Sequence, residues 1–307
     1  MIFQPGVDRI AKRLSGGYQM RRLVLMLLVI GTATVAQERT VDPTWLYRNI
    51  SSLAQHQIDV STGSCHYTAI FGEGDSEVRF PLSVARFGEL TVDPHGSCHN
   101  VEYPREEELF FVLHGSGTLL YGQESHSLSE NDFTYVPPTV RHSISNSSDQ
   151  PLRVMLTTVR IPKETQLSAA AKMEVANLSE LKEQTVEGHP NSVLYKLLIG
   201  PHTAKRDRIN ATYQAADFFL MDFAPGGTNF PHHHEIAEEI YLVLDGEGQM
   251  AAGGGMEGVE GLHHAKAGDA YYFRPNCTVG FYNQKTAGAK AHILAVRVFV
   301  PMPKNQD

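Results

Sequence analysis

Short apolar runs recur along most of the chain, and Gly, Pro, Asn and Asp separate one run from the next. Leu109–Leu113 and Ile240–Leu244 are two examples, and a glycine follows closely after each. Runs of this length with such boundaries are typical of β-strands. Residues 163–176 differ, because their Lys, Glu and Ala favour a helix. The pattern therefore predicts an all-β chain with one short helical connector.

The strand pattern occurs twice, because the chain carries two copies of one unit. Glu108–Gly117 aligns without a gap with Glu239–Gly248, and Asp132–Asn146 aligns with Asp269–Asn283. The second copy has a glycine-rich insertion around residues 251–258, which is typical of a hairpin tip. The repeat predicts two tandem sandwich or barrel domains. Their expected ranges are 37–162 for the N-terminal domain, 163–176 for the connector and 177–307 for the C-terminal domain.

A histidine-rich segment precedes the strand Ile240–Leu244. Alternate side chains of an extended chain point the same way, so His232 and His234 share a face and His233 points away. Glu239 stands at the start of the next strand. Two imidazoles and one carboxylate that converge from neighbouring strands form a set typical of Fe(II) and related divalent ions. The alternative is a surface histidine cluster without a ligand.

Each copy resembles a cupin domain, and the whole chain resembles a bicupin over roughly residues 45–300. The resemblance implies two jelly-roll (double-stranded β-helix) barrels and a metal held by His232, His234 and Glu239. The first motif is carried by Pro225, Gly226, His232, His234, Glu239 and Gly246, and the second by Gly268, Asp269, Pro275 and Asn283. The family's fourth ligand is a histidine four residues before the motif-two asparagine, and this chain has Val279 there. Three protein ligands leave positions open for oxygen or substrate, although a lost ligand can also mark decay.

The first copy departs from the family pattern in the opposite way. Glu108 and His142 fill the carboxylate and fourth-ligand positions, but Val101 and Tyr103 replace the paired histidines. We therefore expect a degenerate, metal-free site in a barrel that packs against the second one. The alternative is a metal-binding set of His99, Glu108 and His142. His99 is two and four residues from Val101 and Tyr103, so its side chain would point the same way as theirs.

Strand parity also predicts the lining of the second-barrel pocket. Side chains two residues apart face the same way along a strand, so residues in step with Glu239 or Val279 should face inward. The expected pocket is mostly apolar and aromatic, with the metal at its base. Its predicted lining residues are Tyr241, Val243, Val279, Phe281 and Asn283.

The resemblance implies a metal-dependent protein but fixes neither the metal nor the reaction. We favour Fe(II) or Mn(II), with Zn, Ni and Cu as alternatives. The favoured function is an oxidoreductase of the dioxygenase type that acts on a small organic substrate. The alternatives are a non-catalytic module that binds a sugar or an organic acid, and a metal-dependent decarboxylase or hydrolase. The chain has no Gly-x-Ser-x-Gly elbow and no dinucleotide- or phosphate-binding loop.

The N-terminus has the pattern of a signal peptide over residues 1–36. Arg21 and Arg22 precede the apolar run Leu23–Ile30, and small residues ending at Ala36 follow. Cleavage would give a periplasmic or secreted protein without a stable membrane span; an uncleaved anchor is the alternative. Met20 directly precedes the two arginines, so either Met1 or Met20 could be the start.

The charge of the chain narrows the classes of molecule that it is expected to bind. The net charge is −8, and no basic stripe appears beyond the N-terminus, so we expect no nucleic-acid partner. A small-molecule substrate is the expected partner, and homo-oligomerisation is left open.

The chain has three cysteines. In an oxidising compartment Cys65 could pair with Cys98, since both lie in the first copy; the alternative is that these two and Cys277 are free buried thiols.

Overall fold

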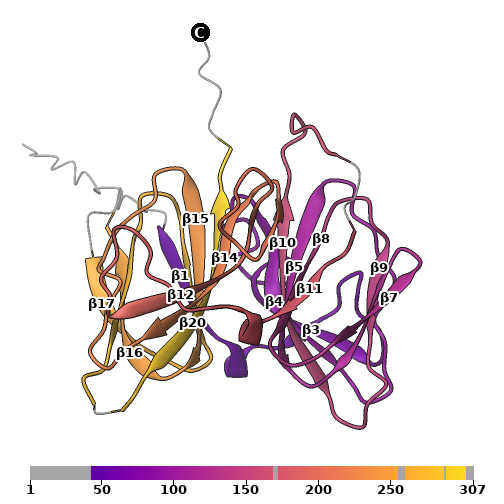
Figure 1. Ribbon diagram of the computed structural model, residues 1–307, viewed down its shortest axis with the longest axis horizontal. Coiled ribbons are helices and arrows are strands. Elements are labelled where there is room, and N and C mark those ends of the chain that lie inside the picture. The colour runs from indigo at the N-terminus through magenta and orange to yellow at the C-terminus, as the bar shows by residue number, and fades with distance from the viewer. Residues whose placement is uncertain (1–42, 169–171, 255–259, 287, 302–307) are drawn as a thin grey trace, which may run out of the picture. The chain divides into compact units, whose positions relative to one another are not determined.

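The protein folds into two β-barrels, as the repeat predicts (Figure 1). The structure is a computed structural model that describes residues 43–168, 172–254, 260–286 and 288–301. Within these ranges there are two 3-10 turns, η1 (Ile50–Ser52) and η2 (Leu178–Glu180), and no α-helix. None of the elements described is a helix long and apolar enough to cross a membrane. The all-β prediction is confirmed. The expected signal peptide, residues 1–36, lies outside the described residues.

Each barrel consists of a seven-stranded sheet and a three-stranded sheet. In the first barrel the order is β11-β8-β5-β10-β4-β3-β2, and the small sheet is β7-β6-β9. The bounds are β2 Gln55–His56, β3 Cys65–Gly72, β4 Val84–Val92, β5 Glu106–His114, β6 Gly117–Tyr121, β7 Glu124–Leu128, β8 Asp132–Val136, β9 His142–Ser145, β10 Leu152–Arg160 and β11 Val175–Asn177.

The second barrel repeats this arrangement except at one edge, where β13 pairs parallel with β12 while β2 of the first barrel pairs antiparallel with β3. Its large sheet has the order β1-β18-β15-β20-β14-β12-β13, and its small sheet is β17-β16-β19. The predicted hairpin insertion separates β16 from β17, and residues 255–259 at its tip are outside the described ranges. The bounds are β1 Trp45–Asn49, β12 Val193–Pro201, β13 Ile209–Thr212, β14 Ala215–Phe223, β15 Ala237–Asp245, β16 Glu247–Gly253, β17 Glu260–Lys266, β18 Asp269–Phe273, β19 Thr278–Asn283 and β20 Ala291–Phe299.

The barrels exchange their outermost strands. β1 lies in the range predicted for the first domain, yet it pairs antiparallel with β18 of the second barrel. β11, from the predicted connector, pairs with β8 of the first barrel. Equivalent side-chain bonds fix both strands, because Asn49 Nδ2 donates to Asp269 Oδ1 at 2.6 Å and Asn177 Nδ2 donates to Asp132 Oδ1 at 2.7 Å. The exchange covers sheet edges that would otherwise present unpaired backbone groups.

The predicted helical connector is wrong. The described parts of residues 163–176 form turns and extended chain that lead into β11. Thr134 Oγ1 on β8 donates to the carbonyl oxygen of Glu174 at 2.7 Å, next to the strand pairing. Helix propensity is a weak bias of well under 1 kcal/mol per residue. Here the hydrogen bonds to an open strand edge outweigh it.

A pair of buried glutamates ties the two barrels together. Glu107 on β5 accepts the backbone N–H groups of Tyr213–Ala215 at 2.7–2.8 Å. Glu238 on β15 accepts those of Leu82–Val84 at 2.6–2.8 Å. Each carboxylate thus holds the start of a strand in the other barrel, and bonds of this charge-assisted kind are stronger than neutral ones. A tyrosine hydroxyl donates to each glutamate as well, Tyr135 to Glu107 and Tyr272 to Glu238.

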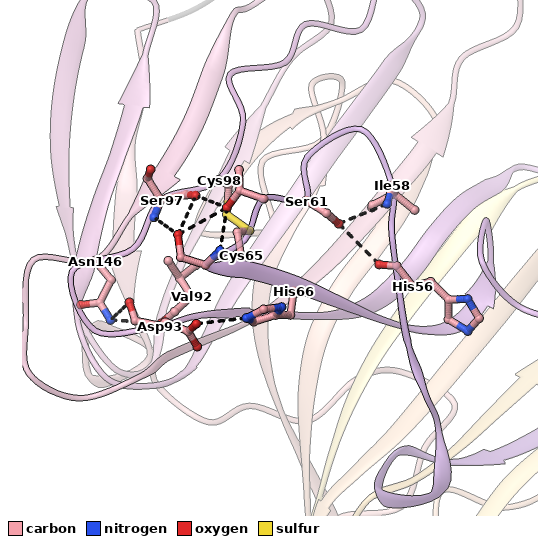
Figure 2. Close-up of a disulfide and its surroundings, with 12 residues drawn as sticks. His56, Ile58, Ser61, Cys65, His66, Val92, Asp93, Ser97, Cys98 and Asn146 are labelled. Atoms are coloured by element: carbon pink, nitrogen blue, oxygen red, sulfur yellow. Dashed lines mark hydrogen bonds and ion pairs between the residues drawn. A yellow bond between two sulfur atoms is a disulfide. The ribbon is translucent and has the colours of Figure 1, made fainter.

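The first barrel contains a disulfide between Cys65 at the start of β3 and Cys98 in the loop after β4 (Figure 2). The two Cα atoms are 5.0 Å apart, and 33 positions separate the residues in sequence. Backbone bonds hold the same loop, since Cys98 N donates to the carbonyl oxygen of Ile144 at 2.8 Å. Of the two alternatives from the sequence, the structure has the bridged pair, and Cys277 is buried and not part of a disulfide.

Candidate metal centre

Three predicted ligands meet at one end of the second barrel. His232 lies in the loop before β15 and exchanges two backbone hydrogen bonds with Val279 on β19, at 2.9 and 2.8 Å. His234 follows two residues later, and Glu239 is the third residue of β15. Their ligand atoms all lie within 4.8 Å of one another, and no other group of His, Cys, Asp and Glu meets this test in the described ranges. The structure therefore brings together the set that the sequence predicts.

The free atoms of this triad fit a metal ion. His232 Nδ1 is 2.8 Å from the carbonyl oxygen of Phe230, to which it can donate, so Nε2 is left as the ligand atom. His234 Nε2 and Glu239 Oε2 face each other at 3.2 Å, and neither atom has another partner in the described structure. A metal ion between them would bind both atoms. Histidine ligands usually donate their second ring N–H to a carbonyl or carboxylate, and His232 has this arrangement.

The charges of the triad agree with a ligand role. Burial alone would raise the pKa of Glu239, but the neighbouring His234 imidazole, followed by Arg297, holds that pKa below its usual range. Burial lowers the pKa of His232. The carboxylate is therefore ionised and the His232 imidazole is neutral near pH 7. These are the protonation states in which both groups bind metals.

The triad opens into a small cavity of about 40 Å³. Arg297 lies on β20 directly opposite Glu239 and also opposite Asp217 on β14, so the three side chains form one row across the sheet. Arg297 and Arg206 both bind the Asp217 carboxylate. Tyr241 lines the cavity too, and its hydroxyl accepts a hydrogen bond from Asn229 Nδ2 at 3.0 Å. The wall therefore carries two guanidinium groups beside the candidate ligands.

The equivalent place in the first barrel is filled by an ion pair. His142 Nε2 and Glu108 Oε2 are 2.5 Å apart, and His142 Nδ1 is 2.9 Å from the carbonyl oxygen of Val140. Burial alone would lower the pKa of His142, but the hydrogen bond and charge of Glu108 outweigh it and raise the pKa. Val101 pairs with His142 across the strands, and Tyr103 makes a ring contact with it at 6.2 Å.

A buried guanidinium group reinforces this ion pair. Arg86 on β4 lies 4.0 Å from Glu108 and pairs more closely with three other carboxylates, those of Asp59, Glu73 and Glu106. His99 is exposed and lines a nearby cavity of about 10 Å³. Within the described ranges it joins no ligand group with Glu108 and His142. The alternative three-residue set of the first barrel is therefore not formed.

Comparison with known families agrees with this arrangement. The family model of the cupin domain matches the chain twice, at residues 88–158 and 219–296. The chain is a bicupin.

Solved structures of the same fold span nearly the whole bicupin. A Pseudomonas aeruginosa protein described as glyoxylate-induced has a TM-score of 0.68 at 14% identity, covering 89% of this chain and 96% of that one. Protein YlbA of E. coli scores 0.62 at 16% identity, covering 88% and 97%. A Lactobacillus farciminis oxalate decarboxylase scores 0.60 at 13% identity, covering 86% and 88%. At these identities the likeness shows the fold alone.

One relative is similar in sequence over a short stretch. The uncharacterised protein MJ1618 of Methanocaldococcus jannaschii is 31% identical over 49 residues. These residues make up 16% of this chain and 39% of that protein. The stretch supports neither a shared activity nor a shared substrate.

The predicted pocket of this bicupin needs correction. Of its five predicted lining residues, Tyr241 lines the cavity beside the triad and the other four do not. Val243, Val279 and Phe281 face inward, as parity predicts, but they are buried in the packed barrel core. Asn283 Nδ2 donates to three backbone carbonyls, those of Phe223, Ala224 and Ala289. Parity tells which side chains point inward, but it does not tell which end of the barrel stays open.

The sequence did not reveal eight other residues that line the cavity, of which Val186, Leu197 and Phe219 are apolar and five are polar or ionisable. They come from five separate places in the chain: the loop before β12, β12 itself, the loop before β13, β14 and β20. Barrel closure brings them together, and none of them stands in a motif. The five polar or ionisable residues are His189, Tyr195, Arg206, Asp217 and Arg297.

Three of these five lie next to the triad, and one of them, Arg297, has its Nη1 3.4 Å from His234 Nδ1. The His189 ring lies 5.0 Å from the His232 ring, and its Nδ1 is 3.0 Å from the carbonyl oxygen of Asn229. The hydroxyl of Tyr195 is buried without a hydrogen-bond partner among the described residues. Burial and the charge of Glu239 raise the pKa of Tyr195, so its hydroxyl stays protonated and can donate.

Proposed function

We propose that the second barrel holds one divalent transition metal through His232, His234 and Glu239. The observation that carries this proposal is the approach of the three ligand atoms to within 4.8 Å of one another. Fe(II) and Mn(II) are favoured by the 2-His-1-carboxylate set, and Zn, Ni and Cu remain alternatives. When bound, such an ion supplies a Lewis acid and a template for a substrate.

We further propose that the protein is an enzyme of the dioxygenase type acting on a small organic substrate. Three protein ligands leave coordination positions open, which is typical of catalytic sites. The chain's own residues would set the shape and polarity of the reaction space. The buried Tyr241 ring closes its base, while Arg297 and Asp217 form a polar wall. The cavity of about 40 Å³ limits the substrate to a small molecule.

The test combines metal analysis with oxygen consumption. Protein purified from its native compartment should contain about one equivalent of a transition metal. Adding small organic acids, alcohols and sugars in turn should reveal a substrate that consumes oxygen in proportion to its loss. Protein that contains no transition metal, and that takes none up from solution, would contradict the metal assignment.

A second function, decarboxylation or hydrolysis without oxygen, is favoured by the two arginines in the cavity wall. Guanidinium groups recognise carboxylates well, and an oxalate decarboxylase is among the proteins that share this fold. The same assay under argon separates the candidates. Carbon dioxide released without oxygen indicates a decarboxylase, and a metal-loaded protein that binds its ligand unchanged indicates a binding module.

We propose that the mature protein is exported and begins near Gln37. The charged and apolar pattern of residues 21–36 supports this. The Cys65–Cys98 disulfide supports it too, since such bonds persist in oxidising compartments. N-terminal sequencing of protein from the native host tests the proposal, and an intact N-terminus on cytoplasmic protein would contradict it.

A further inference from the structure

We propose that the cavity beside the candidate metal centre takes a small carboxylate, and that Tyr195 donates the hydrogen bond that positions it. This inference rests on the proposed function, because the ligand would have to share the cavity with a metal at His232, His234 and Glu239. It goes further by naming the chemical class of the ligand and a residue that recognises it.

The hydroxyl of Tyr195 is a buried hydrogen-bond donor on a residue of the cavity wall. Tyr195 lies on β12 and is 4% exposed, and its hydroxyl has no hydrogen-bond partner in the described ranges. Its ring is fixed between those of His189 and Phe219, at centroid distances of 5.5 and 5.7 Å. Buried tyrosine hydroxyl groups usually find a partner. A phenol beside the metal triad can provide one donor to an oxygen atom of the ligand.

The first barrel provides an internal comparison. Tyr67, at the equivalent position of the repeat, is fully buried and its hydroxyl also lacks a partner. Tyr67 is not among the residues that line the small first-barrel cavity beside Glu108 and His142, whereas Tyr195 lines the cavity beside the triad. Burial without a partner is therefore common to both tyrosines, but only Tyr195 belongs to the wall of a cavity that contains the triad.

The charges around the cavity favour an anion. Arg206 and Arg297 balance the carboxylates of Asp217 and Glu239. The cavity wall would then have no spare negative charge to balance a divalent cation at the triad. Asp207, 3.5 Å from Arg206, offsets at most one of these charges. A carboxylate would complete the balance and would supply oxygen atoms for both the metal and the Tyr195 hydroxyl.

The size of the cavity limits the ligand further. Its volume of about 40 Å³ has room for roughly three or four water-sized groups, at about 10–15 Å³ each. A metal ion and its ligand must share this space, so the smallest carboxylates suit it best and a sugar ring suits it least.

The experiment compares two probes of equal size on three metal-loaded proteins. Glycolate carries the carboxylate, and glycolamide is its neutral counterpart. The wild type, Tyr195→Phe and the control Tyr67→Phe are each loaded with the metal found by elemental analysis. Metal content is measured for each protein before titration calorimetry with both probes.

We expect the wild type and Tyr67→Phe to bind glycolate equally and to bind glycolamide at least about tenfold more weakly. Tyr195→Phe should bind glycolate about 10- to 100-fold more weakly than the wild type, as expected for the loss of a hydrogen bond to a charged group. Metal content should be the same in all three proteins, because Tyr195 is not a ligand.

Each other outcome contradicts one part of the proposal. Equal glycolate affinity in Tyr195→Phe and the wild type would exclude the positioning role. Equal affinity for the two probes, or no glycolate binding by the metal-loaded wild type, would exclude the carboxylate class. A wild type that takes up no metal would contradict the proposed function itself, and it is recognised before any probe is added.

Discussion

The two barrels share one backbone frame but distribute their charges differently across it. In both, a glutamate on the third strand position faces the site, Glu108 on β5 and Glu239 on β15. The cross-strand row that starts at Glu108 continues with Thr158 and Arg86. The row that starts at Glu239 continues with Arg297 and Asp217. The cation therefore stands on a different strand in each barrel.

This difference in charge placement gives the two glutamates different partners. In the first barrel the guanidinium of Arg86 is buried among four carboxylates and supplies the positive charge itself. In the second barrel Arg297 binds Asp217 instead, and Glu239 Oε2 faces only the His234 imidazole, at 3.2 Å. The first barrel thus places a protein cation near the carboxylate where the second barrel has the candidate metal triad, without a change in strand register.

The histidines differ between the barrels in a complementary way. His232 and Val279 form a cross-strand pair in the second barrel, and Val101 and His142 form the equivalent pair in the first. Each barrel has therefore kept a histidine on one strand of this pair and an apolar residue on the other. The first keeps the family's fourth ligand, and the second keeps the paired histidines.

The largest effect on stability should come from the two buried glutamates that join the barrels. Glu107→Ala and Glu238→Ala should each lower the free energy of unfolding by about 3–5 kcal/mol, because each leaves several buried N–H groups without an acceptor. Urea unfolding of the purified variants measures this. Glu107→Gln and Glu238→Gln, which keep one acceptor oxygen, should lose less. A large loss of unfolding free energy for only one of the two glutamates would show that Glu107 and Glu238 are not equivalent.

The next largest effect should be on metal binding, and it should distinguish the second-barrel triad from the first-barrel ion pair. His232→Ala and Glu239→Ala should lower metal affinity at least about 100-fold, close to 3 kcal/mol, because each removes a direct ligand and even indirect partners of ligands account for 10- to 100-fold. His142→Ala in the first barrel is the matched control and should leave metal content unchanged. Metal titration with elemental analysis gives the result. Full metal content in both second-barrel variants would overturn the assignment of the site.

The sequence predicts this site well because its ligands are close together in the chain. His232, His234 and Glu239 lie within eight residues of one another, so alternation places the two histidines on one face and the bend before β15 brings Glu239 of the next strand to them. Arg297 and Tyr195 belong to strands far from this segment, and only the pairing of the sheets brings them to it. The pairing of β1 and β11 with the opposite barrels could not be predicted either, because it depends on tertiary structure and not on local sequence.

A smaller effect should come from restoring the family's fourth ligand. Val279 is 1% exposed and lies opposite His232, so Val279→His should place an imidazole next to the existing ligands. Metal binding should tighten and turnover should fall, because an open position is consumed. Without metal, the buried imidazole should lower stability by about 1–3 kcal/mol, and added metal should restore the melting temperature.

The control for this variant is Val243→His. Val243 is equally buried in the same core, but its cross-strand partner is Ile293 rather than His232. It should lose similar stability without recovery on metal addition. If Val279→His changes neither metal affinity nor the metal dependence of the melting temperature, residue 279 does not face the metal.

The smallest effect concerns the ion pair of the first barrel. The pKa of His142 is raised in the folded protein, because the hydrogen bond and charge of Glu108 outweigh the opposing effect of burial. A raised pKa means that the folded state binds the proton more tightly than the unfolded state, whose histidine pKa is about 6.5. The stabilisation is therefore complete below about pH 6.5 and is lost as pH rises through the folded pKa.

Urea unfolding between about pH 5.5 and 9 tests this. The stability of the wild type should fall relative to that of His142→Gln by up to about 1.4 kcal/mol per pH unit within that window, the limit for one proton. Glu108→Gln should flatten the same dependence, because it removes the charge that raises the pKa. Parallel profiles for the wild type and His142→Gln would mean that the first-barrel site carries no such proton. It would then resemble the second barrel, where Val279 occupies the equivalent position.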